Sequence, residues 1–116
     1  MGETTALIKV YGELDFVQIE ALVDTGATFT KLPNSIAKKL GLKARYETTV
    51  ELSDGRLVKR DLALAEVEIE GVRRPMLIAI SENEERPLVG YTTLEILGFK
   101  INPITRKLEK SFAIEY

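Results

Sequence analysis

The sequence contains neither cysteine nor histidine. Without cysteine, the chain has no disulfide, no thiol nucleophile and no thiolate ligand for a metal. Without histidine, it lacks the usual general base, the serine–histidine–aspartate triad and the commonest zinc ligand. We therefore expect no metal and no cofactor, and a hydrolase built on this chain would use carboxylates as its acid and base.

An excess of positive charge and long hydrophobic runs are also lacking. The net charge is −2, with 16 lysines and arginines against 18 aspartates and glutamates. No basic surplus is present to neutralise phosphates, so we expect no nucleic-acid partner. No apolar run approaches the length of a membrane span, and the first residues lack the apolar region of a signal peptide. These absences predict a cytoplasmic protein without a membrane partner.

What is present is the composition of an ordinary globular protein. The 116 residues are 45% hydrophobic and 29% charged, which provides enough apolar residues for a buried core. A chain of this length suits one domain and leaves little room for two. We expect a single domain over residues 1–116.

Alternating apolar residues predict an N-terminal hairpin. In residues 4–11, Ala6, Ile8 and Val10 fall on one face of a strand. After a turn at Gly12, residues 14–23 continue the alternation.

A second hairpin is predicted around Asp54 and Gly55. The flanking segments 46–53 and 56–70 alternate between apolar and polar residues. An Asp-Gly pair in this setting favours a type I′ turn, which needs positive φ at both positions. Gly71 predicts the next turn.

Two short helices and several short strands complete the pattern. Residues 35–40 follow Asn34, a suitable N-cap, and end at Gly41. Residues 92–97 end at Gly98. Further strand candidates are residues 29–32, 72–80, 99–101 and 107–116. With about eight short strands and one or two short helices, the best class is an all-β domain that is barrel-like or closed by dimerisation.

One of the four aspartates, Asp24, stands out. It follows an apolar run and precedes Thr25, Gly26 and Ala27, which predicts a partly buried carboxylate at a strand end, on a stiff loop. The alternative is an ordinary Asx turn, which favours the same residues. The glutamates at positions 66, 68 and 70 alternate on one strand face and are interpreted as solvated.

A pair of aspartates can hydrolyse peptide bonds without histidine, cysteine or metal. Two carboxylates about 3 Å apart cannot both ionise, so they share one proton and can hold a water between them. The ionised member takes a proton from this water, and the protonated member hydrogen-bonds to the developing oxyanion. Only one Asp-Thr-Gly is present. A twofold axis would supply the second Asp24 from an identical chain, which predicts a homodimer.

These residues resemble the retropepsins, the family of retroviral proteases and their cellular relatives. The chain is similar in particular to small retropepsin-like proteins of archaea and bacteria. The resemblance covers residues 7–101 in matching order. It consists of an apolar strand before Asp24-Thr25-Gly26-Ala27, a hairpin at the position of the family's flap, and Leu88-Val89-Gly90 before a short helix. It implies a retropepsin-like acid protease barrel.

The resemblance also implies roles for the residues of the Asp-Thr-Gly loop. Asp24 would be the catalytic acid and base. Thr25 would hydrogen-bond across the dimer, and Gly26 would offer its carbonyl to the bound peptide. Ala27 and Thr28 would line the substrate groove.

Two further segments receive roles by the same resemblance. Val89 and Gly90 would pack behind the catalytic loop. The flap tip over the substrate would consist of Ser53, Asp54, Gly55 and Arg56.

The chain departs from the retroviral pattern at two places. Retroviral enzymes have an Asp where Thr28 stands and an Arg where Tyr91 stands, and the ion pair between them supports the dimer. The flap tip here is Ser-Asp-Gly-Arg rather than a segment with several glycines.

Three interpretations follow. The first is an aspartic endopeptidase that acts as a homodimer on a peptide or protein substrate. The second is a catalytically silent module of the same fold that dimerises and binds extended peptides by strand addition. The third is an unrelated β-barrel with a chance motif. The intact Asp-Thr-Gly favours the first, whereas the altered flap and the missing ion pair favour the second.

Overall fold

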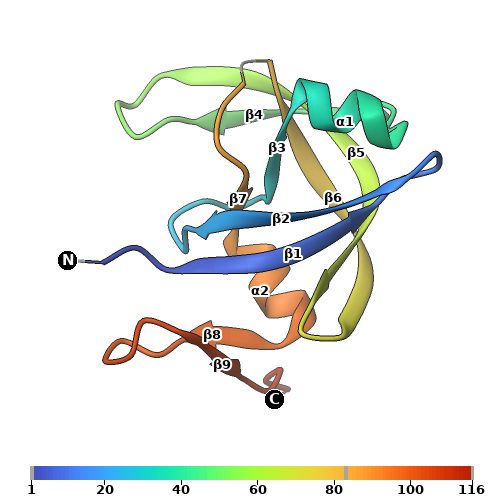
Figure 1. Ribbon diagram of the computed structural model, residues 1–116. Coiled ribbons are helices and arrows are strands. Elements are labelled where there is room, and N and C mark those ends of the chain that lie inside the picture. Colours follow the sequence, from blue (N-terminus) through green and yellow to red (C-terminus); the bar gives the residue numbers. More distant parts are fainter. Residues whose placement is uncertain (1, 83, 116) are drawn as a thin grey trace.

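Strands dominate the computed structural model, which describes residues 2–82 and 84–115 (Figure 1). The helices are α1 (Asn34–Leu40) and α2 (Tyr91–Leu97). The strands are β1 (Thr5–Tyr11), β2 (Phe16–Val23), β3 (Lys31–Pro33), β4 (Tyr46–Glu51), β5 (Leu57–Ile69), β6 (Val72–Ser81), β7 (Leu88–Val89), β8 (Phe99–Ile101) and β9 (Leu108–Lys110). The expectation of an all-β domain with two short helices is confirmed.

The main sheet closes on itself. Its strand order is β1-β2-β7-β3-β6-β5-β4, and β1 also pairs with β5. The N-terminal hairpin pairs Ala6 with Ala21 and Val10 with Val17, as the alternation predicted. The closing contact between β1 and β5 pairs Val10 with Val67. Among the described strands of this sheet, β4 lies outside the closed ring and pairs with β5, and β8 and β9 form a separate two-stranded sheet.

The core fills the inside of this ring. Ala6, Ile8 and Val10 of β1 are buried, and the alternate residues of this strand are more exposed. The burial of the long strand β5 differs between its two ends. Burial begins at Leu62, so its first residues lie outside the core while its later residues form part of it. β5 therefore connects the core to the projecting hairpin described below.

The predicted helix ends are correct, but the predicted N-cap is wrong. Gly41 and Gly98 adopt left-handed conformations with φ of 73° and 81°, which glycine tolerates without strain. Asn34 is already the first helical residue, and Pro33 precedes it with no side-chain cap. Proline lacks the N–H that a helix start leaves unpaired, and its fixed φ suits the entry to the helix.

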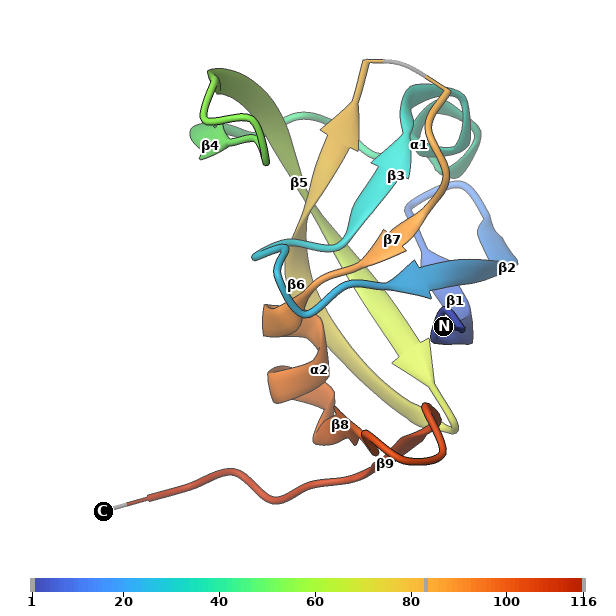
Figure 2. The ribbon, with the colours of Figure 1, turned by 90° about the vertical axis from the view of Figure 1, so that its left-hand side faces the viewer.

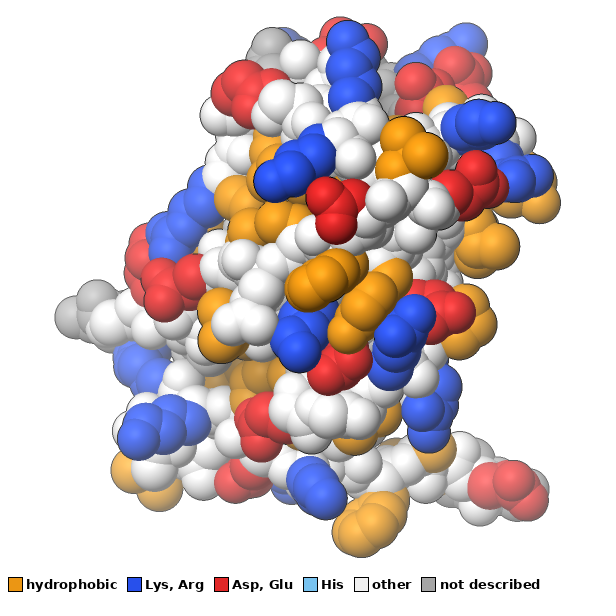
Figure 3. All heavy atoms as spheres, turned by 45° about the vertical axis from the view of Figure 1, so that its right-hand side comes forward, with side chains coloured by type: hydrophobic (Ala, Val, Ile, Leu, Met, Phe, Trp, Pro, Cys, Tyr) orange, Lys and Arg blue, Asp and Glu red, His pale blue; other side chains and the backbone are white. Residues whose placement is uncertain are grey.

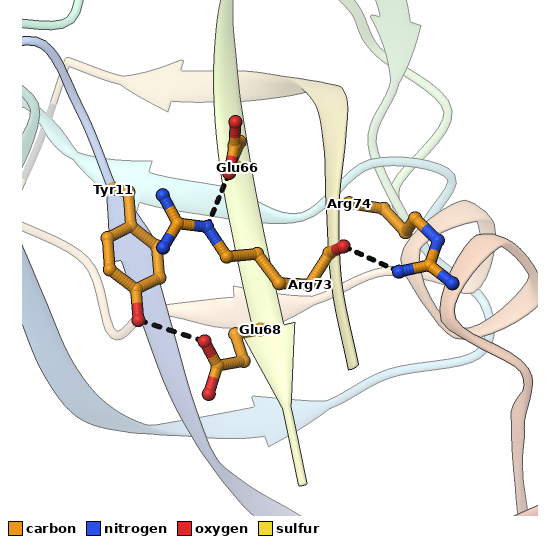
Figure 4. Close-up of polar contacts among 5 residues, drawn as sticks. All are labelled: Tyr11, Glu66, Glu68, Arg73 and Arg74. Carbon is orange, nitrogen blue, oxygen red and sulfur yellow. Dashed lines mark hydrogen bonds and ion pairs between the residues drawn. The ribbon is translucent and has the colours of Figure 1, made fainter. Parts of the chain in front are cut away.

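A polar cluster ties the ends of β1, β5 and β6 together (Figure 4). The Arg73 guanidinium lies 3.5 Å from the centre of the Tyr11 ring and donates to Glu66. The Tyr11 hydroxyl donates to Glu68 Oε1 at 2.9 Å, which is the largest cause of the raised pKa of Tyr11. Glu66 and Glu68 are thus engaged in contacts rather than simply solvated, and only Glu70 fits the predicted exposed face.

The C-terminal end differs from its prediction. The strand expected over 107–116 is limited to β9. Residues 111–115 are not part of a strand, although the Ser111 N–H donates to the Gly98 carbonyl at 2.8 Å, and Tyr116 lies outside the described residues. Figure 2 shows this segment extending away from the sheet. Figure 3 shows charges of both signs interspersed with hydrophobic side chains on one face of the molecule. Within the described residues, no helix is long and apolar enough to cross a membrane.

Candidate active site

Asp24 lies directly after β2, where that strand pairs in parallel with β7. Val23 pairs with Val89, and the Asp24 N–H donates to the Val89 carbonyl at 2.9 Å. The apolar run before Asp24 is thus a strand anchored in the core, and its end fixes the backbone of the aspartate.

The residues after Asp24 form a tight turn. The Ala27 N–H donates to the Asp24 carbonyl at 3.2 Å, and the Gly26 N–H donates to Asp24 Oδ1 at 2.9 Å. The second bond is the Asx turn that the sequence left open as an alternative. It occupies one carboxylate oxygen. Within residues 2–82 and 84–115, Oδ2 forms no hydrogen bond or ion pair with the protein.

The prediction of a partly buried Asp24 is wrong for this chain. Asp24, Thr25 and Gly26 are all exposed. The turn carries them to the surface, and within the part of the chain that the structure describes nothing covers them. The exposed loop ends at Thr30, which is fully buried.

The start of α2 holds the loop from below. The Tyr91 N–H donates to the Ala27 carbonyl at 2.7 Å. Thr92 donates both its N–H and its hydroxyl to the Thr28 carbonyl, at 3.1 and 2.6 Å. The first N–H groups of a helix have no partner within the helix. Here the loop carbonyls satisfy them, so α2 needs no side-chain cap and the loop has a fixed shape.

A buried chain of hydroxyls links the loop to the core, and the sequence analysis missed it. The Gly90 N–H donates to Thr30 Oγ1 at 3.1 Å, and Thr30 and Thr93 share a hydrogen bond of 2.5 Å. The Thr93 hydroxyl donates to Met76 Sδ at 3.1 Å, so Thr30 is the donor to Thr93. Both threonines are fully buried. No local pattern in the sequence marks two threonines that are 63 positions apart as partners.

Gly90 is required by close packing. A Cβ at this position would lie 2.4 Å from both the carbonyl carbon and the carbonyl oxygen of Phe29. Both contacts are with backbone, which cannot rotate away as a side chain can. Val89 and Gly90 therefore lie directly behind the Asp24 loop.

The hairpin of β4 and β5 projects above the Asp24 loop (Figures 1 and 2). No residue between positions 43 and 61 is buried. The predicted hairpin is confirmed, but the predicted type I′ turn is wrong. The Leu52 N–H donates to the Arg56 carbonyl, and Gly55 has φ of 88° while Asp54 is not among the residues with positive φ. This is a three-residue loop with glycine at its left-handed position.

The tip of the hairpin is closed by its own ion pair. Asp54 accepts from the Arg56 N–H at 3.0 Å and from Arg56 Nε at 2.7 Å, and these contacts hold the pKa of Asp54 below its usual value. A lowered folded-state pKa stabilises the turn above the ordinary pKa of an aspartate, and this stabilisation is lost as the pH falls below it. Asp54 is therefore ionised and able to pair with Arg56 at weakly acidic and neutral pH.

A cleft of about 470 Å³ lies between the hairpin and the Asp24 loop. Its lining includes residues 26–29 of the loop, residues 49–52 and Arg60 of the hairpin, and Leu88 of β7. The predicted groove residues Ala27 and Thr28 thus line this cleft. The other predicted substrate-binding residues lie outside its lining, namely Ser53, Asp54, Gly55 and Arg56 at the tip and Val89 and Gly90 behind the loop.

Sequence comparison places this chain in a family. A family model described as aspartyl protease matches residues 9–93, which include the Asp24 loop, the hairpin and the start of α2. The chain belongs to the aspartyl protease family. A comparison with curated protein sequences found no match.

Solved structures show the retroviral form of the aspartyl protease fold. EIAV protease, solved in complex with the inhibitor HBY-793, is similar with a TM-score of 0.66 and 18% identity, covering 87% of this chain and 93% of that chain. The retroviral protease-like domain of Ddi1 from Leishmania major has a TM-score of 0.58 and 17% identity, covering 92% of this chain and 88% of that chain. The predicted resemblance to retropepsins is confirmed for the family and the fold.

This aspartyl protease chain differs at the positions where retroviral enzymes have their Asp–Arg ion pair. Thr28 uses its carbonyl to accept from Thr92, and the exposed Tyr91 hydrogen-bonds to Glu95, which raises the pKa of the tyrosine. The helix start and the loop are therefore joined by hydrogen bonds to the carbonyls of Ala27 and Thr28. Among the residues that the structure describes, no group of acidic side chains is arranged to hold a metal ion.

Proposed function

We propose that this chain is an aspartic endopeptidase that acts as a homodimer, to which each subunit contributes one Asp24. The observation that carries the proposal is the exposed Asp24 carboxylate, with Oδ1 held by Gly26 and the loop fixed by α2, beside a cleft covered by a hairpin. One chain supplies only half of a two-carboxylate site. A twofold axis through the exposed residues 24–26 would complete it.

In the proposed dimer, the two carboxylates share one proton and hold a water. The ionised Asp24 takes a proton from this water, and the water oxygen bonds to the carbonyl carbon of the peptide. The protonated Asp24 hydrogen-bonds to the oxyanion that forms. The C–N bond then breaks, and the leaving nitrogen takes a proton from the pair. Thr25 is proposed to hydrogen-bond across the axis, and the Gly26 carbonyl to bind the peptide backbone.

The first test combines assembly with activity. We expect sedimentation to show a dimer at high protein concentration, and cleavage of a peptide library to rise with the dimer fraction on a concentration series. Activity that is constant per chain while the protein dissociates to monomers would contradict a site shared between subunits.

The second candidate, a silent peptide-binding dimer, is favoured by the ion pair that closes the hairpin tip and by the residues Thr28 and Tyr91. It predicts that wild-type protein binds extended peptides but never cleaves them. The same library distinguishes the two, because cleaved and retained peptides are identified separately by mass.

The pH profile provides a second prediction, which depends on Ala27. The rate should be bell-shaped because the pair must carry one proton. A hydroxyl on the residue after Asp-Thr-Gly could donate a hydrogen bond to the ionised carboxylate. This bond would stabilise the ionised form over the protonated form at lower pH. Ala27 has no such donor. Ala27→Ser should therefore shift the rate profile to lower pH than in the wild type. Superimposable profiles of kcat/KM for the two proteins would remove this explanation.

A further inference from the structure

The two faces of the β4–β5 hairpin carry different residues. Strand alternation places one set of residues outward, and these are all exposed: Glu47, Thr49, Glu51, Leu57, Lys59 and Asp61. The other set is only partly exposed: Thr48, Val50, Val58 and Arg60. Directly paired residues lie on the same face, and the register pairs Thr48 with Arg60 and Val50 with Val58. Arg60 therefore shares the inner face of the hairpin with two valines.

Arg60 is a lining residue of the cleft between the hairpin and the Asp24 loop. Val50 and Leu88 also line this cleft, so the cationic side chain of Arg60 has apolar residues beside it in the lining. Thr49 and Glu51 border the cleft as well, although the alternation places both of them in the exposed set with Lys59.

The other cations around the cleft have acidic partners. Lys31 of β3 pairs with Glu85, Arg56 pairs with Asp54 at 2.7 Å, and on the outer face Lys59 pairs with Glu47 at 3.5 Å. Their charges are therefore compensated within the chain.

Arg60 is different. Its one hydrogen bond goes to the neighbouring Lys59 carbonyl at 3.3 Å, and within residues 2–82 and 84–115 it forms no ion pair. A guanidinium has five N–H donors in a planar fork that matches a carboxylate. Holding such a group over a cleft without a partner leaves most of these donors available to whatever enters the cleft.

We propose that the cleft takes peptides with an acidic side chain beneath the hairpin, and that Arg60 binds this carboxylate as an ion pair. This inference rests on one part of the proposed function, namely that a peptide occupies the cleft. The apolar residues Val50 and Leu88 would contact the methylene carbons of a glutamate while the carboxylate reaches Arg60. Arg60 is thus a specificity-determining residue and takes no part in the chemical step.

The test uses full-length wild-type protein and the peptides that it cleaves from a library. Each position flanking the cut is replaced in turn by Glu, Gln or Lys. At one position, kcat/KM should be about tenfold higher for Glu than for the isosteric Gln, as expected of a charged hydrogen-bonded pair in a half-open site. The ratio should fall as ionic strength rises, because salt screens partly exposed charges.

Two variants test whether the preference for Glu depends on the inner face of the hairpin. Arg60→Glu should reverse the order and favour Lys at the same position. Lys59→Glu makes the same change in net charge on the outer face of the same strand, and it should keep the preference for Glu. Equal ratios for wild type and Arg60→Glu, or reversal in both variants, would overturn the proposal.

A failure of the proposed acidic preference can be distinguished from a failure of the proposed catalytic activity. If no peptide is cleaved, the same library is bound to immobilised protein. Enrichment of acidic peptides that is lost in Arg60→Glu and kept in Lys59→Glu supports this inference, while the endopeptidase proposal fails. Cleavage or binding without an acidic preference overturns the inference alone, and the absence of both cleavage and binding overturns both proposals.

Discussion

Asp24→Asn should reduce kcat/KM for peptide cleavage by about 10³-fold or more, because general acid–base catalysis alone contributes roughly 10²–10⁴-fold. The amide cannot take a proton from water, and in a homodimer the substitution removes both carboxylates at once. The fold should be retained. The amide oxygen can still accept the bond from the Gly26 N–H, which the structure places at 2.9 Å. The measurement is steady-state cleavage of a peptide obtained from the library.

Asp61→Asn is the matched control. It is the same chemical change at an exposed residue on the outer face of the hairpin, and it should leave cleavage nearly unchanged. Melting temperature and sedimentation of both variants should match wild type. Cleavage by Asp24→Asn at the wild-type rate would show that another site, or a contaminating protease, is responsible.

Gly90→Ala should produce a large loss of stability. The added Cβ would meet the Phe29 backbone at 2.4 Å, so the Asp24 loop or α2 must move. Overpacking of this kind costs about 3 kcal/mol. For a domain of this size that corresponds to a fall in melting temperature of roughly 10–20 °C. The bond from the Gly90 N–H to buried Thr30 would also be strained.

A control for Gly90→Ala is available at the other end of the chain. A Cβ on Gly2 would lie 3.8 Å from its nearest neighbour, a flexible carbon of Arg106. Gly2→Ala should therefore change the unfolding free energy by less than about 0.5 kcal/mol. If both variants melted at the same temperature, the close packing of Gly90 against the loop would be contradicted.

The sequence predicted the parts of the fold that local patterns encode. Alternation identified both hairpins, since one face of each strand must be buried. The glycines at 41 and 98 marked helix ends because glycine adopts the left-handed conformation without strain. The order of apolar strand, Asp-Thr-Gly and hairpin was sufficient to suggest the family that comparison then confirmed.

The contacts that hold the site could not be predicted in this way. The bond between Thr30 and Thr93 joins distant segments, and a threonine on its own does not indicate whether its hydroxyl is buried. The hairpin at Asp54 was predicted but its turn type was not, because Asp-Gly suits both a two-residue and a three-residue loop. The hydrogen bond between Leu52 and Arg56 decides between them. The exposure of Asp24 follows from the turn that carries residues 24–26 to the surface, and the apolar run before Asp24 does not indicate it.

The absence of buried residues between positions 43 and 61 has a consequence for how this protein can change. Substitutions at solvated positions usually alter folding free energy by less than about 0.5 kcal/mol. One wall of the cleft can therefore accept new side chains while the closed sheet beneath stays intact. In such an arrangement, the residues that determine ligand preference differ from those that stabilise the fold. This hairpin is therefore the segment to randomise when new binding preferences are selected.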